Sequence, residues 1–335
     1  MAELTLKHIL AESIRPYTTD KRLSESLSYE VLTQIIQEQH LDLAQILARA
    51  TLIANKNLAH RTNRNAITYR ISARPQEALC YTTESSVSWH IDAETIKKCI
   101  ISTNDVIGLI HNLTFLYDVN IFETLGMRNL SSFVGELFGH EVGKAYHDKL
   151  VKNPNQDGSP DLCVLTPEGK EYIEKNLQAN GQPLPNKEFW SPYPFGGIEV
   201  KSTCGNTPDA ETQPKPLIGE SRLPIMINAE WKAHHQQTKI LLGILWDFMD
   251  GIPTILAAFF RNDLDISIGK DNKDWALTVT PKGASRTTSV SIMRRGGRDK
   301  EEGVKKMGAG WLVLPESKKL HDPICKIFDI KLDRR

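Results

Sequence analysis

An almost unbroken apolar stretch runs through residues 240–260 of this chain of 335 residues. Its two parts, residues 240–249 and 252–260, are both far shorter than the roughly 20 apolar residues that a membrane-spanning helix needs. The stretch must therefore be buried inside a folded protein. We interpret residues 229–250 as a long helix whose second half is apolar almost all round and packs on a sheet. Residues 254–260 then form a strand.

The composition is that of an ordinary globular protein, with 40% hydrophobic residues and 41 basic residues against 41 acidic ones. Proteins that coat nucleic acid usually carry a strong positive excess, because neutralised phosphates supply their affinity. Any nucleic-acid binding by this chain must therefore use a local basic patch. The N-terminus has acidic residues and no apolar core, which argues against a signal peptide. We expect a cytoplasmic protein with no membrane attachment.

Two further absences narrow the class of protein. The cysteines are five in number, widely spaced and without a CxxC pair, so we expect reduced structural thiols rather than a zinc ribbon or a disulfide framework. No GxxxxGK[ST] phosphate-binding loop is present, so we expect no use of ATP.

The pattern of apolar residues divides the chain in two. Residues 1–105 are interpreted as a mainly helical N-terminal region for dimerisation or DNA grip, with helical spacing over residues 24–55 and candidate strands at 66–71 and 86–90. Residues 106–335 form the second domain, with a helix over 129–150 and apolar runs that we interpret as strands at 162–165, 197–202, 254–260, 275–280, 287–293 and 311–314. The predicted fold class is α/β (α+β), a mixed central β-sheet flanked by helices.

Two of these short apolar runs carry carboxylates. Asp161 follows Ser159 and Pro160 and opens one run, and Glu199 lies within the other. If the runs are neighbouring strands, both carboxylates reach one point at the edge of the sheet. Carboxylates and water without soft ligands suit Mg²⁺. Val200 points into the core and leaves its carbonyl as a further ligand, so the predicted metal ligands are Asp161, Glu199 and Val200.

Lys201 completes this group. It lies two residues after Glu199, so the two side chains leave the same face of the strand. Its ammonium is then placed beside metal-bound water, where it stabilises a hydroxide or the charge that develops at phosphorus. A metal and a lysine in this arrangement suit the attack of water on a phosphodiester.

The pattern resembles the PD-(D/E)XK nuclease superfamily, with Pro160-Asp161 as the PD and Glu199-Val200-Lys201 as the (D/E)XK, over residues 129–260. The resemblance implies a restriction-endonuclease-like sheet, Mg²⁺ as cofactor, and an acid on the helix before the PD strand. Glu136 is our candidate for that acid, with Glu141 as second choice. One departure is the 37 residues between Asp161 and Glu199, from which residues 166–194 must loop out.

Within the superfamily the chain is most similar to type II restriction endonucleases. That resemblance implies site-specific cleavage of double-stranded DNA to 5′-phosphate ends by a homodimer, with one active site for each strand.

Two segments are candidates for contact with DNA. The first opens the predicted helix after Lys201 and includes His235, Gln236 and Lys239. The second, residues 282–306, holds eight basic against three acidic residues, and its hydroxyls and arginines suit phosphates and guanine edges. Its candidate residues are Arg286, Ser289, Arg294, Arg295 and Arg298. The alternative is that this segment is a solvated basic loop.

Other interpretations stay open. The enzyme would instead be a repair or recombination nuclease that recognises DNA structure or damage, or the fold would bind DNA without chemistry. A further alternative is that the motif is fortuitous and the chain is an unrelated α/β enzyme. Glu199 and Lys201 would then form a solvated cross-strand pair, and Asp161 would be a turn residue. Asp263 and Asp265, just past a strand end, are a rival acidic pair without a lysine beside them.

Overall fold

The computed structural model describes residues 6–24, 28–47, 49–51, 67–72, 74–82, 84, 86–115, 117, 119–155, 158–178, 190–208, 215–233, 238–267, 272–278, 290–293 and 306–330. The chain forms two compact units, of which the first comprises residues 1–66 and 108–124 and the second residues 67–107 and 125–335. This grouping differs from the expected boundary at residue 105, because residues 67–107 belong with the sheet.

The first unit is helical. It contains α1 (Leu6–Ile14), the 3-10 turns η1 (Arg15–Tyr17) and η2 (Lys21–Ser24), α2 (Tyr29–Glu38) and α5 (Ile121–Thr124). Ser28 caps α2 by accepting a hydrogen bond from the Val31 amide. Apolar side chains of α1 and α2, among them Ile14, Leu32 and Ile35, form its small core.

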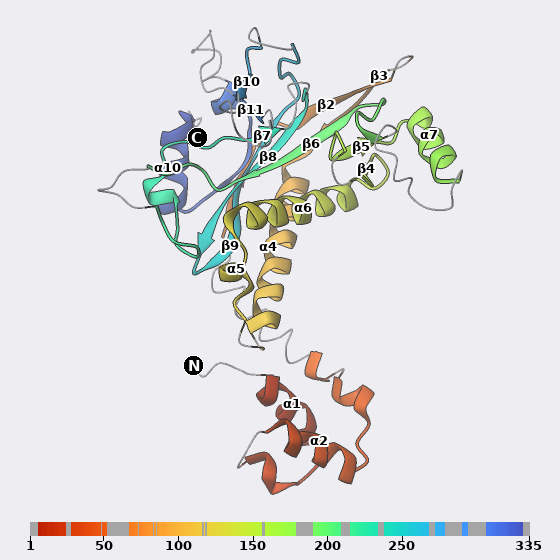
Figure 1. Cartoon of the computed structure of the whole chain (residues 1–335), viewed down its shortest axis with the longest axis vertical. Helices are drawn as coiled ribbons and strands as arrows, with labels where there is room; N and C mark the ends of the chain where they lie inside the picture. Colours follow the sequence, from red (N-terminus) through yellow and green to blue (C-terminus); the bar gives the residue numbers. More distant parts are fainter. Residues whose placement is uncertain are drawn as a thin grey trace, which may run out of the picture. The chain divides into compact units, whose positions relative to one another are not determined.

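The second unit is built on a seven-stranded sheet in the order β1-β12-β9-β8-β6-β5-β4 (Figure 1). The strands are β1 (Tyr69–Ile71), β4 (Leu150–Lys152), β5 (Leu162–Val164), β6 (Gly197–Thr203), β8 (Leu241–Met249), β9 (Ile252–Arg261) and β12 (Trp311–Pro315). Only β6 and β8 pair in parallel, and the other neighbours are antiparallel. The predicted mixed sheet flanked by helices is therefore confirmed at this coarse level.

Two smaller sheets accompany it. One pairs β2 (Gln76–Tyr81) with β3 (Ser86–Ile91). The other joins β7 (Lys232–Ala233), β10 (Trp275–Thr278) and β11 (Val290–Met293). The strands expected near residues 66–71 and 86–90 are present as β1 and β3.

Helices cover both faces of the large sheet. On one face Gly139 of α6 (Met127–Ala145) lies against Val200, whose strand partner is Leu242. On the opposite face Gly243, the partner of Lys201, lies against Trp231, whose ring stacks on Phe328 of α10 (Lys318–Phe328). α4 (Ala93–Phe115) packs on α6 through a hydrogen bond of 2.7 Å from Ser102 to Glu141.

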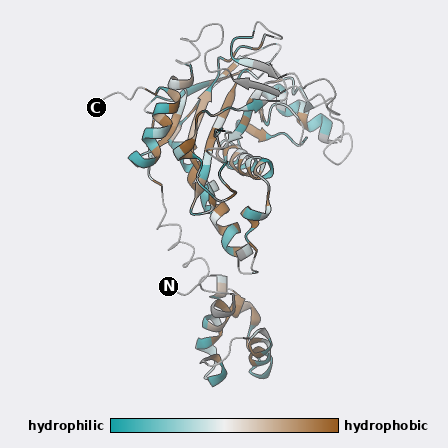
Figure 2. Cartoon of the chain, turned by 60° about the vertical axis from the view of Figure 1, so that its left-hand side comes forward, coloured by the Kyte–Doolittle hydropathy of each residue, from teal (hydrophilic) through white to brown (hydrophobic). Residues whose placement is uncertain are grey.

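The predicted helix over residues 229–250 is wrong. The structure has β7, then β8 and β9 as a hairpin whose strands are buried almost throughout, and these central strands are mainly brown in Figure 2. A strand buried on both faces is a continuous apolar run, which hydrophobic periodicity alone does not distinguish from a buried helix. The missed signal is Asp250-Gly251, because both residues have positive φ, 53° and 79°, as a two-residue hairpin turn requires.

The inserted segment after β5 does not only loop out. It forms α7 (Pro167–Gln178), whose Tyr172 and Ile173 pack against Trp190 and Tyr193 in a small separate core. All five cysteines are free thiols, as expected. None of the helices in the described part of the chain is long and apolar enough to cross a membrane.

Candidate active site

The sheet brings the two halves of the predicted motif together. β5 and β6 are antiparallel neighbours, and their last aligned pair is Leu162 with Ile198. Asp161 and Glu199 come next on each strand, at the point where the pairing ends. The expectation that the two apolar runs are adjacent strands, in spite of the insertion between them, is confirmed.

Lys201 lies between the two carboxylates. Its Nζ is 2.8 Å from Asp161 Oδ2 and 2.8 Å from Glu199 Oε1. The backbone amide of Val200 also donates to Asp161 Oδ2, at 2.8 Å. The N–H and C=O of one residue in an extended strand point to the same side. The Val200 carbonyl is therefore directed toward Asp161 as well, while its side chain is buried as predicted.

Glu199 is the most deeply placed of these charged groups. Its side chain is only 6% exposed, and among the described residues its Oε2 atom has no hydrogen-bond partner. A buried carboxylate oxygen without a partner is costly unless a cation or a donor reaches it. Glu199 therefore presents one carboxylate oxygen without a hydrogen bond beside Asp161 and Lys201. Such an oxygen is a ligand that a hard cation prefers.

The ionisation of the group reflects its crowding. Burial, and then the neighbouring charge of Glu199, raise the pKa of Asp161 to about 6, against the opposing effect of Lys201. Burial disfavours the charged form of Lys201, but the charges of Glu199 and Asp161 together outweigh it and raise the pKa of the ammonium. Lys201 is therefore positively charged near neutral pH.

These residues line a cavity of about 910 Å³ between α6, β6 and the residues 153–155 and 158–161. Glu136 of α6 lies on the same cavity, and its carboxylate forms an ion pair with Lys152 of β4. The charged lining residues are Glu136, Asp161 and Glu199 against Lys152 and Lys201, so acidic groups are in excess. No three His, Cys, Asp or Glu side chains in the described ranges cluster closely enough to hold a metal by themselves. A cation here would depend on two carboxylates, the Val200 carbonyl and water.

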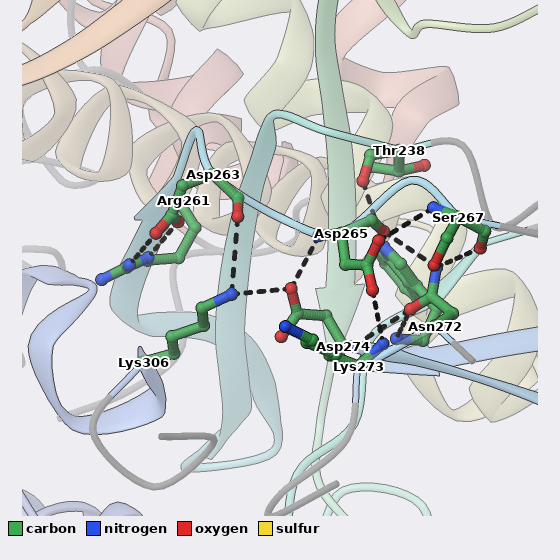
Figure 3. A network of polar contacts seen from close by, with 10 residues as sticks. Thr238, Arg261, Asp263, Asp265, Ser267, Asn272, Lys273, Asp274 and Lys306 are labelled. Atoms are coloured by element: carbon green, nitrogen blue, oxygen red, sulfur yellow. Dashed lines mark hydrogen bonds and ion pairs between the residues drawn. The ribbon is translucent and has the colours of Figure 1, made fainter. Parts of the chain in front are cut away.

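The alternative acids lie elsewhere. Glu141 faces α4 and accepts the hydrogen bond from Ser102. Asp263 forms an ion pair with Arg261, and Asp265 accepts hydrogen bonds from the amides of Ser267 and Lys273 (Figure 3). The rival acidic pair is therefore occupied by its own loop.

The DNA-facing candidates are only partly described. His235, Gln236, Arg286, Ser289, Arg294, Arg295 and Arg298 lie outside the described residues. Lys239 is described, and its Nζ is 3.0 Å from Tyr81 Oη and 4.2 Å from the centre of that ring. Lys306, at the end of the basic segment, pairs at 2.8 Å with buried Asp274 rather than lying free.

Two residues of the cavity were missed by the sequence reasoning. Nothing in the sequence distinguishes Lys152. Asn153 stands directly before Pro154, and an Asn at such a place is typical of a side chain that bonds to nearby backbone.

Comparisons with known proteins add no assignment. No protein-family model, no curated protein and no solved structure matches this chain.

Proposed function

We propose that the chain is a Mg²⁺-dependent endonuclease of the PD-(D/E)XK type that cuts double-stranded DNA at specific sites and leaves 5′-phosphate ends. One observation carries the proposal. Asp161 lies 37 intervening residues before Glu199 in the sequence, yet its carboxylate and that of Glu199 both lie 2.8 Å from Lys201 at one end of a cavity, and one oxygen of Glu199 there has no partner among the described residues.

The donor set fits the metal. Asp161, Glu199 and the Val200 carbonyl are the oxygen ligands, and the acidic excess of the cavity favours a divalent cation. Mg²⁺ bound there would act as a Lewis acid at the scissile phosphate and lower the pKa of its water. The ammonium of Lys201 already balances the two carboxylates, and it can orient the attacking water and stabilise negative charge at phosphorus.

Glu136 has a supporting role in this proposal. Its ion pair with Lys152 lies on the cavity wall formed by α6, away from the Lys201 contacts. Water attacks phosphorus in line and expels the 3′ oxygen. Cleavage of both strands of a palindromic site would need two copies of the chain, so the proposal includes a homodimer.

The test is digestion of unmethylated phage DNA with Mg²⁺, beside EDTA and a Lys201→Met variant. Lys175→Met is the matched control, because Lys175 pairs with Glu171 on the exposed side of α7, at 2.9 Å. Discrete fragments that need Mg²⁺ and Lys201, with 5′-phosphate ends, would support the proposal.

The other outcomes separate the rivals. Cleavage confined to branched, nicked or mismatched DNA would indicate a structure-specific nuclease. Binding of DNA without cleavage in any divalent metal, unchanged in Lys201→Met, would indicate a non-catalytic binding protein. If the chain does not bind DNA even at low salt, the resemblance of the motif would be a coincidence and the chain an unrelated enzyme.

A further inference from the structure

A buried amide side chain, that of Asn153, is bonded to the backbone next to Asp161. Asn153 follows β4, lines the cavity and is only 6% exposed. It belongs neither to the PD nor to the (D/E)XK part of the motif. It nevertheless forms hydrogen bonds with both Pro160 and Asp161, the PD part of the motif.

Asn153 holds both peptide groups around Asp161. Its backbone N–H donates to the Asp161 carbonyl at 2.9 Å, and its side-chain Nδ2 donates to the Pro160 carbonyl at 3.0 Å. These two carbonyls flank the Asp161 Cα, so the bonds fix the direction in which the carboxylate leaves the chain. β5 has only three residues, and Asp161 precedes it. The ladder alone therefore gives this position little support.

The same amide joins the inserted segment to the site. The second hydrogen of Nδ2 is donated to the Trp190 carbonyl at 2.9 Å, and Oδ1 accepts from the Asn155 amide at 2.9 Å. A further bond, from the Tyr193 amide to the Ser159 carbonyl at 2.7 Å, ties the end of the insertion to the loop before Asp161. The separate core around Trp190 and Tyr193 thus supports that loop from outside.

Asn153 is not a candidate for substrate contact through its donors. An amide NH₂ has two hydrogens, and both are donated to backbone carbonyls here. Asn153 can therefore affect the site only through the positions of Pro160 and Asp161, to which it is bonded.

We propose that Asn153 is a positioning residue that sets the orientation of the Asp161 carboxylate and thereby the affinity of the site for a divalent cation. This inference rests on the proposed function. Groups that orient a ligand typically contribute 10- to 100-fold to metal affinity. The inserted segment that separates Asp161 from Glu199 along the chain would then help to support the site, because it supplies Trp190 and Tyr193.

The chain offers a matched control for this test. Asn272 is also buried, at 1% exposure, and its Nδ2 donates to two backbone carbonyls, those of Asp265 at 2.9 Å and Ser267 at 2.6 Å (Figure 3). Its Oδ1 accepts from the backbone amides of Asp274 and Trp275. Asn272 therefore performs the same structural task in a loop where the carboxylate of Asp265 is already taken by backbone amides.

The experiment compares Asn153→Asp with Asn272→Asp. An ionised aspartate keeps the shape but cannot donate, so each variant loses the two donated bonds of its own loop. Mg²⁺ and Mn²⁺ are titrated calorimetrically into the full chain, and the dependence of the cleavage rate on Mg²⁺ concentration is recorded, with thermal unfolding as the measure of stability. We expect Asn153→Asp to weaken metal binding by about 10- to 100-fold and Asn272→Asp to leave it at the wild-type value.

A second variant tests the same contact without changing Asn153. A Cβ at Gly158 would lie 2.5 Å from the Asn153 Nδ2 atom, so Gly158→Ala must displace the amide. We expect the same loss of metal affinity. If either folded Asn153-directed variant binds metal within threefold of wild type, the inference is overturned.

The remaining outcomes are also decisive. An equal loss in Asn272→Asp would show a general effect of stability and contradict the positioning role. Unfolding of both Asn153-directed variants while Asn272→Asp folds would assign Asn153 to global stability instead. If wild type itself neither binds metal nor cuts DNA, the proposed function has failed, and that result is seen before any variant is made.

Discussion

Two polar networks in the sheet unit differ in how their carboxylates are used. Around Asp265 and Asp274 (Figure 3), the two oxygens of Asp265 accept from the backbone amides of Ser267 and Lys273, and Oδ2 of Asp274 accepts from the Asp265 amide and Lys306. Around Asp161 and Glu199, Lys201 bridges two carboxylates, but Glu199 Oε2 has no partner among the described residues, and the group lies on a cavity.

The difference teaches which acids of this chain can serve an external ligand. A carboxylate whose acceptors are taken by its own loop stabilises that loop. A carboxylate with an unused buried oxygen beside a cavity is destabilising by itself and suits a cation that is not part of the chain. The following predictions test that contrast.

The largest expected effect is on chemistry. Glu199→Gln removes the charge that the proposed metal needs, so we expect cleavage to fall by about 10³-fold or more and Mg²⁺ binding to be lost in calorimetry. Asp274→Asn, at the buried carboxylate of the other network, should leave the cleavage rate close to that of wild type. Comparable losses in both variants would contradict the contrast.

The order reverses for stability. Asp274→Asn leaves Lys306 without its buried partner, and breaking such a pair by removing one member costs about 3 kcal/mol. Glu199→Gln relieves the repulsion between two neighbouring carboxylates, so its free energy of unfolding should change by about 1 kcal/mol or less. Urea unfolding without divalent metal measures both. A larger loss in Glu199→Gln would mean that the site is structural.

The next effect is on the pH dependence of the free energy of unfolding, measured without metal. Burial and the charge of Glu199 raise the pKa of Asp161 to about 6 from 3.8. The folded state then holds a proton that the unfolded state has released, so this group favours folding below about pH 4, and its contribution is lost as pH rises through about 6. Asp161→Asn should remove that part of the slope of stability between pH 4 and 7. An unchanged slope would show that Asp161 is not the titrating group.

Added metal should invert this trend. A divalent cation competes with the proton for Asp161, so the stabilisation by Mg²⁺ or Ca²⁺ should grow between pH 5 and 7.5. Thermal unfolding at the two pH values, with and without metal, measures it.

The smallest expected effect concerns the rival acidic pair. Asp265→Ala removes two acceptors of backbone amides, which should cost about 1 kcal/mol of stability, with metal affinity and cleavage unchanged. Loss of Mg²⁺ binding in this variant, with wild-type stability, would move the cation site to the other network.

The site was more predictable than the elements around it. Residue type and spacing single out Asp161, Glu199 and Lys201, and the structure places Lys201 in contact with both carboxylates. The hairpin of β8 and β9 was not predicted, because a strand buried on both faces lacks the alternation that identifies a half-exposed one. Asp250-Gly251 is the signal against a helix here, since an Asp-Gly pair between two apolar runs strongly favours a two-residue hairpin turn.

Sequence alone determined what the chain can offer chemically: oxygen donors with a lysine two residues after Glu199, in a chain of ordinary globular composition without a phosphate-binding loop. Strand geometry made part of this arrangement local, because residues 199 and 201 leave the same face in any strand. Only the tertiary structure decided that β5 lies beside β6 across the 37 intervening residues. It also decided that, among the described residues, one oxygen of Glu199 has no partner while both oxygens of Asp265 accept backbone amides, and that Asn153 bonds to the carbonyls on both sides of the Asp161 Cα. Those facts depend on pairing and burial between distant segments, which no local pattern encodes.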